Sequence, residues 1–240
     1  QNDHYKRDLL IPVPLAAFMI SRIARALAYA HQTIIHRDIS PENLLVNLHG
    51  VVKLMDFGVA VSTAEEGLTG KVSYMSPEQI SGFAVDARTD IYSLGLVLYL
   101  MLTGVHLQRV PARLATLEKV ELVRRLQGRP FLPPNKVRLD IPGPISDICM
   151  KMLTPDREQR YARAEDVARD LEQRYLYAKG FGPTNNSLQA YLEIFDANFK
   201  EIAPQQLQQL PFLNGELRRP LSAKLYSPEG RLLLEETLQR

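Results

Sequence analysis

The residues of this sequence that could do chemistry lie in four short segments between His36 and Asp90. HRDISPEN runs from His36 to Asn43, and DFG begins thirteen residues after Asn43, at Asp56. SPE ends at Glu78, twenty-two residues after Asp56, and DIYSLG begins at Asp90 and leads into an apolar run. Each segment alone is weak evidence, but the four segments in this order and spacing form a specific signal.

The polar side chains in these segments that could do chemistry include two carboxylates, Asp38 and Asp56, and the amide of Asn43. The run LLVNLHGVVKL over 44–54 predicts two short strands around a turn at Asn47–Gly50, and such a pair would bring Asn43 and Asp56 to one cleft. The alternative is that Asp38 and Asp56 are solvated turn residues, which is the common role of a lone Asp.

Apolar residues at helical spacing predict five helices around these segments. Prolines stand before the first helix and Gly104 stands at the end of the second, as is favoured at helix ends. Residues 56–78 are rich in Gly, Ser, Thr and acidic residues without a clear period, so they are predicted to form a long loop. The five helices are predicted over 15–31, 86–103, 114–126, 145–153 and 165–178.

The chain after Gly180 has weaker patterns. Ser187 is a candidate cap for a last amphipathic helix. A strand, turn and strand are predicted over 224–234. The apolar face of the helix would consist of Leu188, Tyr191, Leu192, Phe195 and Phe199.

Composition indicates an ordinary globular protein: 240 residues, 45% hydrophobic and 23% charged. The formal net charge of +2 gives no indication of nucleic acid as a partner. The single cysteine, Cys149, excludes an intrachain disulfide and a cysteine metal cluster, so a reducing, cytoplasmic location is expected. The longest nearly apolar run, 91–102, is shorter than the roughly 20 residues of a spanning helix, so no membrane segment is expected.

The four segments resemble the signature series of the eukaryotic-type, or Hanks-type, serine/threonine protein kinase family. The resemblance covers roughly residues 1–177, and the HRDISPEN and GKVSYMSPEQ variants look most like bacterial members, particularly those of myxobacterial type. It implies a mainly α fold, the protein-kinase-like large C-terminal lobe with short β-strand pairs. It also divides the chain into a partial kinase domain, 1–177, and a C-terminal extension, 178–240.

The resemblance implies transfer of the γ-phosphoryl group of ATP to a Ser or Thr hydroxyl of a protein in the intact parent chain. Asp38 matches the carboxylate that accepts the hydroxyl proton. Asn43 and Asp56 match the magnesium ligands that hold the nucleotide phosphates, and Gly58 closes the DFG segment. Leu45 matches the residue under the adenine ring. ATP, Mg²⁺ and a protein substrate are therefore the implied cofactors and partners.

Other positions match structural residues of the family. His36 and Phe57 are expected to stack in a hydrophobic column, and Asp90 is expected to accept hydrogen bonds from backbone amides of the catalytic loop. Glu78 and Arg160 match a buried ion pair, of which the loss of one partner costs about 3–5 kcal/mol.

Arg37 directly precedes Asp38. In this family, an arginine at that position often marks kinases that are switched by phosphorylation of the activation loop, because a phosphate can pair with it. Thr69 is the first candidate acceptor. Its alternative role is that of a plain polar loop residue. The other candidate acceptors are Ser62, Thr63 and Ser73.

The chain departs from the family pattern at Ser40, where a serine/threonine kinase usually carries Lys. Tyrosine kinases differ there too, but with an alanine and arginine pattern that this chain lacks, so serine/threonine specificity is favoured. Lys71 stands where the family usually has Thr, close to the position of Ser40 in the family fold. We expect the Lys71 ammonium to replace the missing one in catalysis, since Coulomb stabilisation depends on position rather than on residue type.

The glycine-rich loop, strand Lys and helix Glu of the family's N-terminal lobe do not occur in these 240 residues. The N-terminal lobe is therefore expected to be absent and this polypeptide alone to be inactive, and Gln1 in place of Met favours truncation. The alternative is a non-catalytic pseudokinase or scaffold lobe that binds protein partners. Ser40 favours that alternative, and the retention of Asp38, Asn43 and Asp56 argues against it.

Overall fold

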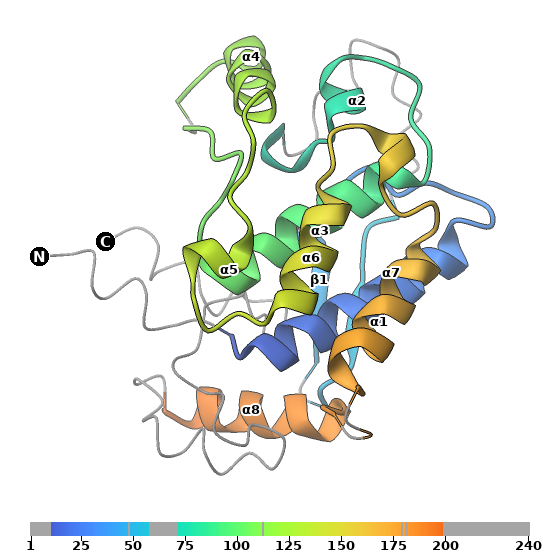
Figure 1. Ribbon diagram of the computed structural model, residues 1–240, viewed down its shortest axis with the longest axis vertical. Coiled ribbons are helices and arrows are strands. Elements are labelled where there is room, and N and C mark those ends of the chain that lie inside the picture. Colours follow the sequence, from blue (N-terminus) through green and yellow to red (C-terminus); the bar gives the residue numbers. More distant parts are fainter. Residues whose placement is uncertain are drawn as a thin grey trace, which may run out of the picture.

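The computed structural model describes residues 11–47, 49–57, 72–111, 113–178, 180 and 182–198, with the backbone alone for 193–198. Its described part is mostly helical, with one two-stranded sheet (Figure 1). The elements are α1 (Val13–Ala30), η2 (Pro41–Asn43), β1 (Leu44–Val46), β2 (Val52–Leu54), η3 (Val72–Tyr74), α2 (Pro77–Ile80), α3 (Arg88–Thr103), α4 (Thr116–Gln127), α5 (Pro134–Val137), α6 (Gly143–Met152), η4 (Arg157–Gln159), α7 (Ala164–Asp170), η5 (Leu171–Leu176) and α8 (Asn185–Asn198).

Helix α1 forms the centre of the core. It starts behind Pro12, as predicted, and packs against α7, α3, β2 and η5. By length and composition alone it could cross a membrane, with a mean hydropathy of 1.3 over 18 residues. In this fold 67% of that stretch is buried inside the protein, as expected of a core helix. The sequence reasoning had considered only 91–102 in this respect.

Helix α3 is buried along almost its whole length and carries polar residues at its N-terminal end. It approaches α6 closely at Gly95, where a methyl group would lie 2.9 Å from Cβ of Met152. The helix ends at Gly104, whose left-handed φ of 73° favours glycine. Because Thr89 and Asp90 are fully buried, α3 presents polar groups inside the protein, next to the segments that the sequence singled out.

The two strands form the antiparallel pair predicted over 44–54. Leu44 pairs with Leu54 and Val46 with Val52. The side chain of Asn47 accepts hydrogen bonds from the amides of His49 and Val51, which fixes the connecting turn. One end of this hairpin therefore joins Asn43 and Met55, where the Met55 amide donates to the Asn43 carbonyl at 2.8 Å.

One apolar core joins α1, both strands, α3, α6, α7, η5 and α8. A smaller cluster lies between the end of the 72–80 segment and α4. In Figure 1 this cluster is at the top of the view, with α2 and α4, and α8 is at the bottom. The smaller cluster consists of Val72, Met75, Ile80, Val120 and Val123.

The five predicted helices are confirmed, with differences at their ends. The last of them changes at Leu171 from α7 to the π-helical turn η5. Helices α2 and α5 were not predicted because four residues are too few to show a period. The long loop predicted over 56–78 is wrong at its described end, which contains η3 and the start of α2. Helix α8 is present, but Thr184 stands at its N-terminal cap and exchanges hydrogen bonds with Ser187, which lies in the first turn. The hairpin predicted over 224–234 and Phe199 lie outside the described residues.

Candidate active site

A buried carboxylate holds the HRD segment in place. Asp90 is fully buried, and its Oδ2 accepts from the His36 amide at 2.8 Å while its Oδ1 accepts from the Arg37 amide at 2.7 Å. Nε2 of His31 lies 2.8 Å from the same Oδ2. Arg37 adopts a left-handed φ of 66°, which is unfavourable for a residue with a Cβ. The two hydrogen bonds from backbone amides to Asp90 therefore stabilise a turn that the Arg37 backbone would not favour by itself.

Asp38 and Asn43 are joined through the short helix η2. Nδ2 of Asn43 donates to the Asp38 carboxylate at 3.0 Å and to the Asp38 carbonyl at 2.8 Å. Asn43 is buried, whereas Asp38 is partly exposed. Both bonds use the Asn43 nitrogen, so its Oδ1 has no hydrogen-bond donor in the described part of the chain. The amide therefore orients the Asp38 carboxylate and keeps one oxygen for a ligand.

Asp56 follows the second strand and reaches solvent. Its backbone has a left-handed φ of 53°. Among the described residues, Asp56 is the second non-glycine residue with such a φ, after Arg37. The neighbouring ring of Phe57 lies 5.0 Å from the ring of His36, and Nε2 of His36 lies 2.9 Å from the Met55 carbonyl oxygen. The hairpin and the His36 contacts thus place the DFG segment beside the HRD segment.

The Arg37 side chain is exposed and has no acidic partner within the described ranges. Its carbonyl oxygen accepts from Nε2 of Gln79 at 2.9 Å. Gln79 in turn completes a capping box with Ser76 at the start of α2. The 76–79 segment is therefore attached directly to the turn that carries Asp38.

A buried ion pair lies behind this segment. Arg160 bonds to Glu78 through both ends of its guanidinium, at 2.7 and 2.9 Å, and Thr89 donates to the same carboxylate at 2.8 Å. Arg160 also donates to the carbonyl oxygens of Thr154 and Pro155, and its guanidinium lies 4.8 Å from the centre of the Tyr92 ring. Burial by itself raises the pKa of Glu78, but the hydrogen bonds and charge of Arg160 outweigh burial and hold that pKa below its usual value.

Sequence reasoning missed three residues of this site, namely His31, Gln79 and Thr89. Gln79 ends the GKVSYMSPEQ segment, but neither that segment nor a period in this one sequence predicts the hydrogen-bond partners of these three residues, which become visible only in three dimensions. Of the other residues expected at the site, some are described by the structure and some are not. Leu45 lies on β1, partly buried, and Ser40 is fully buried. Gly58, Thr69 and Lys71 lie outside the described residues.

The donor chemistry of the site fits magnesium. Within the described ranges, no group of three or more His, Cys, Asp or Glu side chains has the arrangement of a metal site. Mg²⁺ usually takes only one or two carboxylates from a protein and completes its shell with phosphate and water oxygens. Asp56, with its exposed carboxylate, and Asn43, whose Oδ1 accepts no hydrogen bond from the described residues, match this requirement.

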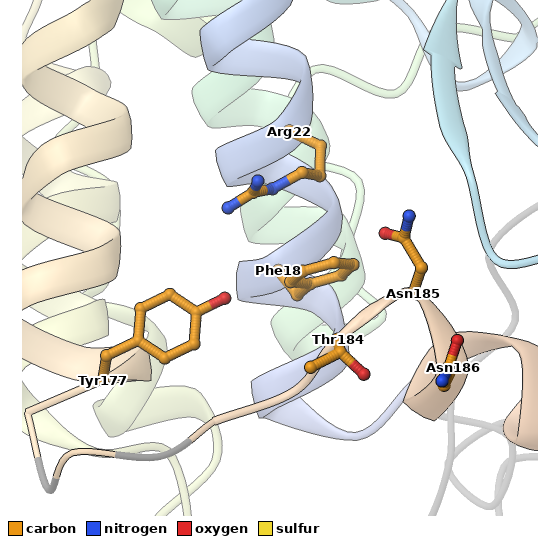
Figure 2. Close-up of a pocket in the computed structure, with 6 residues that line it drawn as sticks. All are labelled: Phe18, Arg22, Tyr177, Thr184, Asn185 and Asn186. Atoms are coloured by element: carbon orange, nitrogen blue, oxygen red, sulfur yellow. The ribbon is translucent and has the colours of Figure 1, made fainter.

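A separate hollow of about 420 Å³ lies between α1, Tyr177 and the start of α8 (Figure 2). Phe18 and Arg22 of α1 line one wall, and Tyr177 and the first residues of α8 line the other. Nη2 of Arg22 bonds to Glu172 at 2.7 Å. None of the residues expected to do chemistry lines this hollow, so it is a junction between α1 and α8 rather than the active site.

The structure therefore brings together a partly exposed carboxylate held by an amide, a second carboxylate at the end of a short hairpin and a buried acid under the connecting turn, which is the arrangement expected of a protein kinase. Residues 1–173 match the family model of the protein kinase domain, and the chain therefore belongs to the protein kinase family. The expected family is confirmed.

Curated relatives include bacterial protein kinases. A probable serine/threonine-protein kinase of Clostridium perfringens is 38% identical over 177 residues, which cover 71% of this chain and 25% of the relative. A probable serine/threonine-protein kinase PknB of Bifidobacterium longum is 33% identical over 198 residues, covering 79% and 27%. Tyrosine-protein kinase MasK of Myxococcus xanthus is 37% identical over 177 residues, covering 68% and 26%. The chain thus spans about a quarter of the length of these relatives.

Proposed function

We propose that this chain is the C-terminal lobe of a serine/threonine protein kinase, which in the full-length protein transfers the γ-phosphoryl group of ATP to a protein hydroxyl. The observation that supports this most strongly is the contact of Asn43 with the Asp38 carboxylate at 3.0 Å, on a loop held by Asp90. A scaffold has no need of a carboxylate oriented in this way. The proposed location is the cytoplasm.

Asp38 is the proposed base for the substrate hydroxyl. It is partly exposed, so a substrate can reach it, and its carboxylate is oriented by an amide of a buried residue. Asn43 and Asp56 are the proposed magnesium ligands, and Leu45 packs against the adenine. Bound Mg²⁺ neutralises charge on the phosphates. The protein's own contribution is to fix these three groups through η2 and the hairpin.

Two further proposals concern charges near Asp38. Arg37 is exposed and without a described acidic partner, which suits a phosphate on Thr69. Lys71 supplies the ammonium that Ser40 lacks. Lys71→Met in the full-length protein tests the second proposal: we expect slower phosphoryl transfer, and an unchanged rate would contradict it.

Serine/threonine specificity is proposed because most of the relatives named above carry that name, although one is named as a tyrosine kinase. The test uses the full-length protein with labelled ATP, Mg²⁺ and a mixed protein substrate, followed by phosphoamino acid analysis. We expect phosphoserine and phosphothreonine. Phosphotyrosine alone would overturn the specificity, and no phosphate transfer by a folded protein would favour the scaffold. The 240 residues alone are the matched comparison, and we expect them to be inactive.

A further inference from the structure

Helix α8 lies beyond the part of the chain that matches the family, yet it touches the hairpin that carries both proposed magnesium ligands. The contact point is Gly50 in the β1–β2 turn. A methyl group on Gly50 would lie 2.0 Å from the carbonyl oxygen of Asn185 and 2.8 Å from the amide nitrogen of Gln189. Both are backbone atoms of α8, so a side chain at Gly50 would require the helix to move.

The helix is anchored on its other contacts. Leu188 and Tyr191 are almost fully buried, in the same core as Leu44 and Leu54 of the hairpin. Thr184 and Ser187 exchange hydrogen bonds at the helix start and fix the first turn. Figure 2 shows this first turn, with Asn185 below the strand and facing α1. The first turn of α8 is therefore held in place, and the β1–β2 turn packs against it.

The hairpin is short, so a displacement of the β1–β2 turn reaches Asn43 and Asp56 at its other end. Each strand has three residues, and the turn between them is fixed by the Asn47 side chain. At the opposite end, Asn43 directly precedes β1, and the Met55 amide bonds to the Asn43 carbonyl at 2.8 Å just before Asp56. At about 3.3 Å per residue, a three-residue strand spans roughly 10 Å. A shift of the turn has little room to be absorbed before it reaches the ligands.

We propose that the first turn of α8 positions Asn43 and Asp56 for magnesium by bracing the β1–β2 turn at Gly50. This inference rests on the proposed function, since it takes those two residues as the magnesium ligands. It makes α8 part of the working kinase unit, and Gly50 a positioning residue rather than a catalytic one.

The test is Gly50→Ala in the full-length protein, with Gly82→Ala as the matched control. Both glycines have left-handed φ values, 69° and 71°, so added Cβ atoms cause similar backbone strain. Only Gly50 faces another element, because nothing lies within 4 Å of a methyl group on Gly82. Mg²⁺ is titrated into each protein saturated with ADP. We expect Gly50→Ala to raise the Kd for Mg²⁺ about tenfold over the control, the lower end for the loss of support behind a metal ligand.

Amide hydrogen exchange gives a second measurement that needs no metal. We expect faster exchange at Val52 and Leu54 in Gly50→Ala than in Gly82→Ala. Equal Kd values and equal exchange in the two variants would overturn the bracing role. Asn43→Ala separates this from the proposed function: a weaker Kd with Asn43→Ala but no difference between the glycine variants refutes the brace alone. No effect of Asn43→Ala refutes the magnesium assignment itself.

Discussion

Two buried polar centres share the N-terminal end of α3, and they differ in the partners they use. Asp90 accepts hydrogen bonds from the main-chain amides of His36 and Arg37, which are neighbours in the sequence. Glu78 instead forms a side-chain ion pair with Arg160, 82 residues further along the chain. One centre therefore fixes the geometry of a single turn, and the other holds together distant segments.

We expect this difference to separate the proposed catalysis from stability. The catalytic turn contains a left-handed Arg37 and reaches solvent at Asp38, so it depends on Asp90 for its conformation. The Glu78–Arg160 pair is buried, and both its carboxylate and its guanidinium have hydrogen-bond partners. It touches no group that we expect to react. Changes at the first centre should act mainly on the rate, and changes at the second mainly on the free energy of unfolding.

The largest expected effect is on the ion pair. Arg160→Met leaves the Glu78 carboxylate buried without its charged partner, and we expect the free energy of unfolding to fall by about 3–5 kcal/mol. Arg163→Met is the matched control, because Arg163 pairs with Glu165 at the surface, where an ion pair contributes less than about 1 kcal/mol. Urea unfolding measures both variants. Equal losses would show that the buried Glu78–Arg160 pair contributes no more to stability than a surface ion pair.

Asp90→Asn tests the other centre. The backbone amides of His36 and Arg37 use different oxygens of the carboxylate, and Asn has an NH₂ group in place of one of them, so one backbone N–H loses its acceptor. We expect a loss of about 1–3 kcal/mol in urea unfolding, together with a drop in kcat at nearly constant KM for ATP. A stability loss with an unchanged kcat would show that the turn keeps its conformation without Asp90.

A pH effect is expected at His106, on the α3–α4 connection. Burial and the nearby Arg109 charge lower the pKa of His106 from 6.5 to about 4. The unfolded chain therefore takes up a proton first, and stability falls as the pH drops from 6.5 to 4, by up to about 1.4 kcal/mol per pH unit. His106→Phe keeps a ring against Tyr74, whose ring centre lies 4.8 Å away, and should flatten unfolding curves in this window. An unchanged slope would contradict the assignment.

A smaller pH effect belongs to Glu78. Its pKa lies below the ordinary 4.5, so the folded protein binds fewer protons than the unfolded chain, and the stabilisation is lost as the pH falls below 4.5. Glu78→Gln lowers stability at every pH because Arg160 loses its charged partner, but it should reduce the further loss below pH 4.5 and leave the slope of stability against pH above 4.5 unchanged. Unfolding at a series of pH values between 6 and 3 compares the variant with the parent. If the two proteins lose stability in parallel below 4.5, the ion pair does not contribute there.

The sequence predicted the protein kinase family because the order and spacing of the four segments carry the signal. It also predicted the strand pair from its turn residues and the main helices from their period. It could not predict that His31 and Gln79 meet this turn, since both contacts join segments far apart in the chain. The contact of Gly50 with α8 has the same origin, because a glycine in a hairpin turn is expected there whether or not a helix lies against it.

The central claim is that Asp38 acts chemically and is not needed for the fold. The measurement that tests it most directly is the rate of phosphoryl transfer by Asp38→Asn in the full-length protein, with urea unfolding of the same sample. We expect the rate to fall about 10²–10⁴-fold while the unfolding midpoint stays at the parent value. A rate equal to that of the parent protein would contradict the account.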